Sequence, residues 1–238
     1  KSAAMYGDEA NIENTGTSTN LIASITTKKD ESAGMYAKNS NATNKKKITV
    51  EGKKSAAILV EMTKNKNISG INDIADNSSD ILNGHIEVKN QESAAMYGKI
   101  DSKVSVATST LTLINKKAID IDAKSSVGMM LINDSNSVNK TNVKAENSGV
   151  ITLNGVTLNT EPKSLAFYTT DNGKIDFGTG TTKTTANIKG GTDSNSRGTA
   201  FLYKGTGASY SKFDSKEISK WAAANFAHLN NLKLVLEL

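Results

Sequence analysis

The residues that could carry out acid–base chemistry are sparse in this chain. Asp120 and Asp122 alternate with Ile119 and Ile121, so both carboxylates are expected on the outer face of one strand. Glycosidases and lyases need two carboxylates, or a carboxylate and a cation, at close range. However, outward strand faces are polar in general, and no aromatic residues surround this pair in the sequence. We therefore expect no catalysis by this pair and predict that the protein is not an enzyme.

Metal and cofactor sites are not expected either. The two histidines, His85 and His228, lie far apart, and the chain has no cysteine. Glycine-rich turns at residues 178–182 and 189–198 do not connect a strand to a helix, as a nucleotide-binding loop does. The net charge of +5 comes mainly from lysines scattered over turns, which argues against nucleic-acid binding. The sequence thus predicts no metal, no cofactor and no nucleic-acid partner.

Four tyrosines are the candidate binding residues. Tyr6, Tyr36, Tyr97 and Tyr168 occupy one position of a short phrase that returns along the chain. A line of exposed rings beside small residues suits the binding of sugars or of a partner protein. Alternatively, the rings stack on one another and only stabilise the outer face.

The phrase that positions these tyrosines is an internal repeat. It reads ESAAMYG at residues 92–98 and returns at intervals of 23 to 38 residues. A self-similar period in this range indicates a solenoid, in which each repeat buries its apolar face against its neighbours. The other copies lie at residues 1–7, 31–37, 54–60, 125–131, 163–169 and 197–203.

The phrase itself is expected to be a β-strand. Strand alternation places Ala3 and Met5 on one face, and Ala4 and Tyr6 on the other. The inward column is predicted to contain Met5, Met35, Ile58, Met96, Met129, Phe167 and Phe201. The outward column is predicted to contain Tyr6, Tyr36, Leu59, Tyr97, Met130, Tyr168 and Leu202, with the Ala or Gly two residues earlier beside each of them.

Two further strands are expected in each coil. An apolar pair precedes the phrase at residues 25/27, 48/50, 86/88 and 119/121, in the register I-x-[V/I/T]. In the next interval the pairs at 151/153 and 156/158 depart from this register and Pro162 follows, so we expect a bulge or loop there. A third strand is expected near residues 10–12, 104–106, 138–143 and 175–177.

These elements predict an all-β fold, a right-handed parallel β-helix with three strands per coil and about seven coils. A barrel or a sandwich would not repeat one phrase in parallel register. We expect one structural domain, with the repeats at residues 1–213. Residues 214–238 differ, because Asp214 and Glu217 resemble a capping box before a helix that includes Trp221 and Phe226. This helix and a following strand are expected to form an end cap or a side excursion.

Two segments depart from the repeat. Residues 39–47 are expected to form a polar loop at a solvated corner. Residues 65–84 are expected to form either a one-turn helix on the side of the coil or a third strand with a long loop. The sequence also lacks a secretory signal and a long apolar run, and it begins inside a copy of the phrase. We therefore expect a piece of a longer protein that is not itself embedded in a membrane.

The SxGMY-type strand after an I-x-V strand, repeated in a cysteine-free chain rich in Lys, Asn and Thr, resembles the passenger regions of large fusobacterial autotransporter adhesins. The resemblance covers residues 1–203 and rests on a structural repeat, so it transfers no binding residues. It implies type V secretion, and a β-helical passenger displayed at the cell surface and anchored by a C-terminal β-barrel that lies outside this sequence. The lack of cysteine agrees with passage through the periplasm.

The resemblance and the tyrosines together predict a role in adhesion and virulence. The expected partner is a protein or glycan on another bacterium or on a host cell, and the expected state is a monomer. The segment would either bind this partner itself or serve as the rigid shaft that presents a binding site. The alternative is a β-helical polysaccharide lyase or hydrolase, although a single arginine and the absence of an acid cluster argue against it.

Overall fold

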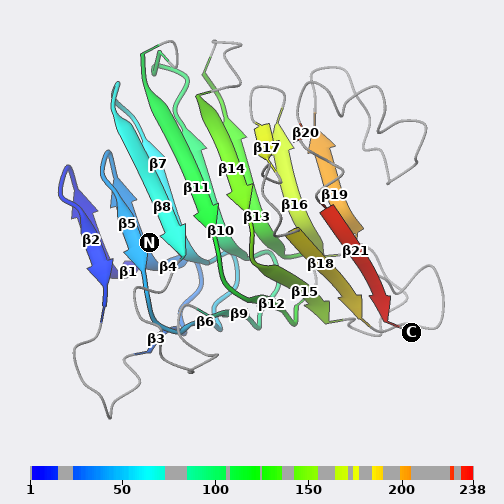
Figure 1. Cartoon of the computed structure of the whole chain (residues 1–238). Coiled ribbons are helices and arrows are strands. Elements are labelled where there is room, and N and C mark those ends of the chain that lie inside the picture. The colour runs from blue at the N-terminus through cyan, green and yellow to red at the C-terminus, as the bar shows by residue number, and fades with distance from the viewer. Residues whose placement is uncertain are drawn as a thin grey trace.

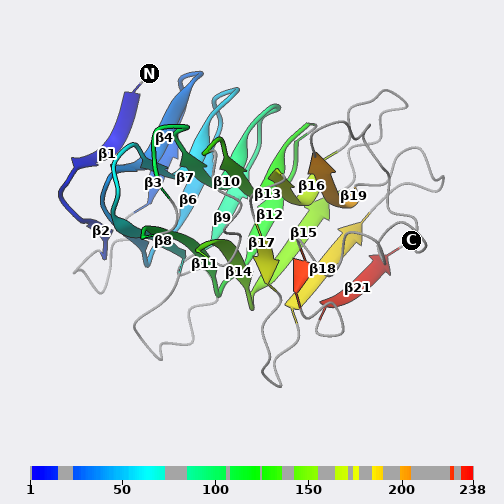
Figure 2. The ribbon, with the colours of Figure 1, turned by 90° about the horizontal axis from the view of Figure 1, so that it is seen from above.

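The computed structural model of the chain describes residues 2–15, 24–72, 85–105, 108–123, 125–135, 142–154, 164–170, 174–176, 184–189, 199–204, 226–227 and 232–237. Within these residues every regular element is a β-strand, and the strands form three parallel seven-stranded sheets (Figures 1 and 2). We name them sheets A, B and C, in the order in which the chain visits them. Three consecutive strands make one coil, and each coil stacks on the previous one. The predicted parallel β-helix of seven three-stranded coils is confirmed.

Sheet A consists of the copies of the repeated phrase. The two predicted columns pair in register from the first coil to the last, one from Met5 to Phe201 and the other from Tyr6 to Leu202. The inward column is fully buried from Met35 to Phe167. The strands are β1 (Ser2–Asp8), β4 (Ser32–Lys38), β7 (Ala56–Met62), β10 (Ala94–Ile100), β13 (Val127–Asn133), β16 (Leu165–Thr170) and β19 (Thr199–Lys204).

Sheet C consists of the apolar pairs that precede the phrase. All four predicted pairs are strands there, and Ile151 pairs with Ile119 in the same register. The pair at residues 151/153 therefore keeps its place in sheet C although it lies further from the phrase in the sequence, and the bulge or loop expected before the phrase falls on residues 155–163, outside the described residues. The strands are β3 (Ile25–Thr27), β6 (Ile48–Val50), β9 (Ile86–Val88), β12 (Ile119–Ile121), β15 (Val150–Asn154), β18 (Thr184–Lys189) and β21 (Leu232–Glu237).

Sheet B is where the sequence predictions were least accurate. The strand expected at residues 104–106 lies further along, from Thr110 to Asn115, and Val104 is buried in the turn before it. The polar loop expected at residues 39–47 contains a strand whose Ala42 and Asn44 are fully buried. The strands are β2 (Ile12–Asn14), β5 (Ala42–Asn44), β8 (Asn67–Asn72), β11 (Thr110–Asn115), β14 (Val143–Asn147), β17 (Lys174–Asp176) and β20 (Phe226–Ala227).

Strand β8 decides between the two alternatives for residues 65–84. Residues 67–72 form a strand that pairs with β5 and β11, so the third-strand alternative is confirmed. Residues 73–84 lie outside the described residues.

A buried asparagine ladder runs under the corner between sheets B and C. The side-chain amide of each asparagine donates to the Oδ1 of the next, at 2.7–2.9 Å. Most of these amides also donate to the backbone carbonyl two residues later, at 2.7–3.1 Å. The ladder therefore satisfies buried polar groups and fixes the tight turn into sheet C. Its members are Asn14, Asn44, Asn72, Asn115 and Asn147.

The repeated serine of the phrase forms a second ladder, at the corner between sheets C and A. The hydroxyl groups of Ser55, Ser93 and Ser126 each accept from the backbone amide of the preceding serine, at 3.1–3.2 Å. The Ser93 hydroxyl donates to the carbonyl oxygens of Gly52 and Gln91, at 3.0 and 3.1 Å. These serines are buried, so the most regular residue of the repeat stabilises a turn.

Sheets A and B fit together by alternating large and small side chains. A Cβ atom on Gly98 of sheet A would meet Leu111 at 2.8 Å and Leu131 at 3.0 Å. A Cβ atom on Gly70 of sheet B would meet Val60 at 2.7 Å. A glycine in one sheet thus makes room for a larger residue of the other sheet or of the next coil.

The C-terminal region differs in part from the prediction. Phe226 belongs to strand β20, which pairs with β17, so the expected helix does not include it. Residues 214–225 lie outside the described residues. The predicted final strand is confirmed as β21, which continues sheet C. The structure, as far as it is described, contains no helix of the length and apolarity needed to cross a bilayer.

Candidate functional site

The candidate site is a groove on the outer face of sheet A. Strands β4, β7, β10, β13 and β16 bend at one position, where two successive residues face the interior. The strand pairing is interrupted at this position. For example, Ala33 pairs with Ala56 and Met35 pairs with Ile58, but the residues between them do not pair. A Cβ atom on Gly34 would contact Ile48 of sheet C at 3.0 Å, so this position points inward. Because all the bends are in register, the outer face is concave along the stack.

The bend corrects one sequence prediction. Strict alternation placed the Ala or Gly two residues before each tyrosine on the outer face. Instead, these positions face the core, and Ala57, Ala95 and Ala166 are fully buried. Their place in the groove is taken by the residue before them, namely Ala3, Ala33, Ala56, Ala94 or Val127.

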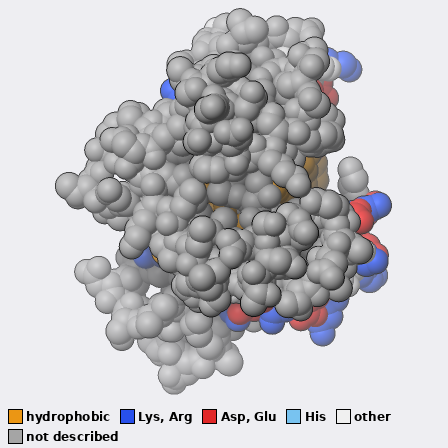
Figure 3. Space-filling view, turned by 90° about the vertical axis from the view of Figure 1, so that its right-hand side faces the viewer, with side chains coloured by type: hydrophobic (Ala, Val, Ile, Leu, Met, Phe, Trp, Pro, Cys, Tyr) orange, Lys and Arg blue, Asp and Glu red, His pale blue; other side chains and the backbone are white. Residues whose placement is uncertain are grey.

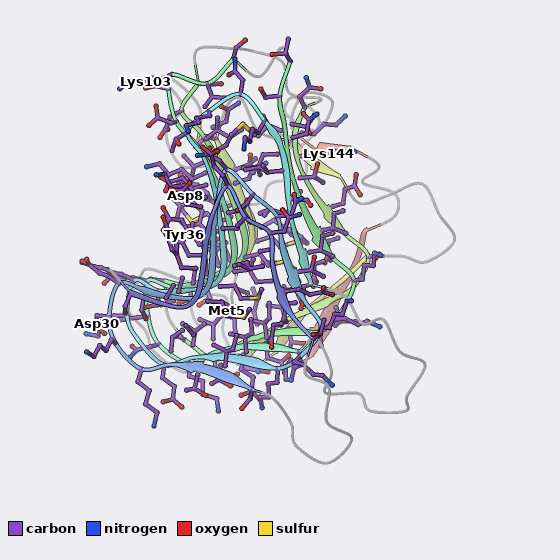
Figure 4. All side chains as sticks on the ribbon, turned by 90° about the vertical axis from the view of Figure 1, so that its left-hand side faces the viewer. Met5, Asp8, Asp30, Tyr36, Lys103 and Lys144 are labelled. Atoms are coloured by element: carbon purple, nitrogen blue, oxygen red, sulfur yellow. The ribbon has the colours of Figure 1, made fainter. Side chains whose placement is uncertain are left out.

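The groove has a volume of about 790 Å³ and extends over five coils. In Figure 4, which looks along the stack, Tyr36 lies in the angle of sheet A and Met5 lies on its interior side. One wall is formed by the small residues named above, and the other wall is formed by Tyr6, Tyr36, Leu59, Tyr97 and Met130.

Three of the four predicted tyrosines line the groove. Tyr6, Tyr36 and Tyr97 lie on one wall, whereas Tyr168 continues the same column beyond Met130 without lining it. Tyr6 is 56% exposed, and the Tyr6 and Tyr36 ring centroids are 5.2 Å apart at an interplanar angle of 54°. The predicted ring contact therefore exists, and it leaves ring surface open to the groove.

Hydrogen bonds and burial define the state of the tyrosine hydroxyls. The Tyr36 hydroxyl donates to Glu61, and the Tyr6 hydroxyl donates to Asp8 at 3.4 Å. Burial, together with Glu61, raises the pKa of Tyr36 well above its ordinary value. Burial, with smaller contributions from Asp134, Glu61 and Tyr168, raises the pKa of Tyr97 to about 12. Both side chains are thus neutral phenols at physiological pH.

Each edge of the groove carries a ladder of alternating charges. Past the tyrosine wall, Asp8, Lys38, Glu61 and Lys99 pair in register on successive strands. Lys38 and Asp8 form an ion pair at 3.2 Å. We call these four residues the tyrosine-side rim. Opposite charges on neighbouring strands avoid the repulsion that a stack of identical residues would cause.

The other edge repeats this arrangement in opposite phase. Glu31, Lys54 and Glu92 precede the repeated serine in successive coils and line the groove. We call them the serine-side rim. Lys54 and Glu92 form an ion pair at 3.6 Å, and all three residues have φ of 54–60°, an uncommon conformation for residues other than glycine.

Sequence reasoning missed this charge pattern. The signal was present, because opposite charges flank three successive copies of the phrase seven residues apart, at 31/38, 54/61 and 92/99. In Figure 3 the visible acidic and basic side chains likewise lie close beside one another at the periphery of the molecule.

The carboxylates of Asp120 on β12 and of Asp122 directly after it belong to a network of polar contacts. Asp120 lies 2.8 Å from Nε2 of the buried His85, and Asp122 accepts a hydrogen bond from Asn154. Asp120 also neighbours Glu87 across the sheet, but Glu87 lies 2.7 Å from the amine of Lys47.

Cations therefore set the charge state of this network. Burial opposes ionisation of Glu87, but hydrogen bonds and charges from Lys47 and Lys89 outweigh it and lower the pKa of Glu87. The carboxylates of this network thus have partners in the His85 ring, the Asn154 amide and the lysine amines. Among the described residues, no group of three or more His, Cys, Asp or Glu side chains is placed to hold a metal ion.

No family model, curated protein or solved structure matches this chain.

Proposed function

We propose that the chain is an adhesive segment of a surface-displayed autotransporter passenger. It binds a protein or glycan on another bacterium or on a host cell, and the stack of coils serves as the rigid support of the binding face. The passenger assignment derives from the resemblance of the repeat, and the adhesive role derives from the groove.

One observation supports adhesion above the others. The groove presents aromatic and aliphatic side chains of five successive coils on one face, between two charged rims. An exposed apolar strip with a polar border is typical of an interaction site. Tyr36 and Tyr97 are the clearest cases, because both side chains remain partly exposed although their strands are paired on both sides.

The test is direct binding of the purified chain to a panel of bacterial and epithelial cells. Its fold is first verified by far-UV circular dichroism. We expect saturable binding that falls at least about fivefold when Tyr36 and Tyr97 are both replaced by serine, because two aromatic contacts contribute about 1 kcal/mol or more.

The matched control is Val150→Ser. Val150 is an exposed apolar residue, at 38%, but it lies on sheet C outside the groove. This variant should bind as well as the parent chain. If the folded parent chain binds no cell type, or if the double tyrosine variant binds as well as the control, an adhesive role of this segment is wrong.

A further inference from the structure

We infer that the groove of sheet A binds an uncharged, linear glycan chain that lies along the stack and contacts successive coils. This inference rests on the proposed function, and it specifies the chemical class and the orientation of the ligand.

The charge pattern excludes charged polymers. The tyrosine-side rim contains two acidic and two basic residues, and the serine-side rim places Lys54 between Glu31 and Glu92. Within each of these coils, one rim carries a carboxylate and the other rim carries an amine, as Glu31 and Lys38 do. A polyanion or polycation along the groove would therefore meet a like charge at every second coil. Hydroxyl groups can instead donate to the carboxylates and accept from the amines at every coil.

The backbone of sheet A excludes an extended peptide that adds a strand. Such recognition requires an open sheet edge with free amide and carbonyl groups. The strands that cross the groove from β4 to β13 are paired on both sides, so the groove offers side chains alone. A ligand must therefore gain its affinity from ring faces and from the side-chain groups of the rims.

The walls suit sugar rings. The phenol groups of Tyr6 and Tyr36 already donate to rim carboxylates, which leaves the ring surfaces to contact the ligand. Ala33, Ala56 and Ala94 keep the opposite wall low and smooth. Coils repeat every ~4.8 Å, which is close to the length of one pyranose unit, so five coils offer a path of ~19 Å along the stack.

Length-dependent binding is the test. The intact chain is titrated by isothermal calorimetry with cello-, manno- and chito-oligosaccharides from the disaccharide to the hexasaccharide. We expect at least one of these series to bind, with an affinity that rises about tenfold from the disaccharide to the tetrasaccharide and then levels off as the groove is filled. Tyr97→Phe should preserve this binding, because it keeps the ring face, and Tyr97→Ser should weaken it several-fold.

Charged probes test the electrostatic argument. Polygalacturonate, heparin and single-stranded DNA should not bind the parent chain at low ionic strength. The double variant Glu31→Lys, Glu92→Lys makes the serine-side rim entirely basic and should acquire salt-dependent binding of polygalacturonate. Binding of a charged polymer to the parent chain would overturn the inference. So would failure of all three neutral series, or an affinity that does not depend on oligosaccharide length.

These outcomes are separable from the adhesion test. A chain that binds cells but none of the neutral oligosaccharides keeps its adhesive role and loses the proposed ligand class. A chain that binds the oligosaccharides but no cell keeps the ligand class and loses adhesion.

Discussion

The asparagine ladder makes a quantitative prediction about stability. Asn72 lies in its centre, where it accepts from Asn44 at 2.9 Å and donates to Asn115 at 2.8 Å, and all three side chains are fully buried. Asn72→Ala removes both hydrogen bonds and leaves a buried polar atom on each neighbour, at about 1–3 kcal/mol each. The amide of Asn44 keeps its bond to the carbonyl of Lys46, and the Oδ1 of Asn115 still accepts from the backbone amide of Lys117 at 3.4 Å, so both losses are moderated. We expect a total loss of about 2–4 kcal/mol in the free energy of unfolding.

Two controls isolate the ladder. Asn14 is the first member described and makes one ladder bond, to Asn44 at 2.9 Å, so Asn14→Ala should cost about 1 kcal/mol. Asn67 lies on the same strand as Asn72 but is exposed, and its Oδ1 accepts from the backbone amide and the hydroxyl of Thr110 at 3.0 and 3.1 Å, so Asn67→Ala should cost about 0.5–1 kcal/mol, less than Asn72→Ala. Urea unfolding followed by circular dichroism measures all three variants. A loss for Asn72→Ala no greater than that for Asn14→Ala would refute the reasoning.

Three further predictions concern titration and packing. Because the pKa of Glu87 is lowered in the folded chain, its ionised form contributes stability above the ordinary value of 4.5 that is lost as the pH falls through the folded value. Glu87→Gln should therefore flatten the acid limb of a plot of unfolding free energy against pH. The pKa of Tyr97 is raised to about 12, so the stability gained from its neutral form is complete below the ordinary value of 10.0 and is lost as the pH rises through about 12. In an alkaline titration followed by tyrosinate absorbance, Tyr97→Phe should remove one late-titrating group, and an unchanged late phase would contradict the assignment. Gly98→Val should cost about 1–3 kcal/mol by urea unfolding, because Leu111 and Leu131 occupy the space of the new side chain, and a neutral effect would show that the leucines can move aside.

The sequence predicts sheets A and C well because bulky apolar residues mark them. Large apolar residues equivalent to Met96 and Ile86 occur in successive coils at the same distance from the repeated serine. The repeat of these buried positions is therefore visible in the sequence. Sheet B is marked instead by asparagine and by small residues such as Ala42 and Gly70. These residues are typical of loops, and here they lie inside the coil because neighbouring coils satisfy or fill them. The sequence of a single coil does not show these contacts between neighbouring coils.

The groove was predictable only in part. The tyrosine column follows from alternation, but the concave shape follows from the bend at Gly34, where two successive residues face inward. A pattern of period two cannot reveal such a bend, because the small residue at this position fits either face. The charged rims could have been found, since Glu31 begins one copy of the phrase and Lys38 directly follows it, but their alternation is visible only after the coils are stacked.

The alternating charges of the rims also restrict how a stack of such coils can grow by duplication of its coils. Asp8, Lys38, Glu61 and Lys99 change sign at every step, so the duplication of a single coil would place two equal charges on neighbouring strands. Duplication of two adjacent coils keeps the sign order on both rims intact. In this part of the molecule, the smallest unit that can be copied without electrostatic conflict is therefore the coil pair, although the smallest unit of the fold is the single coil.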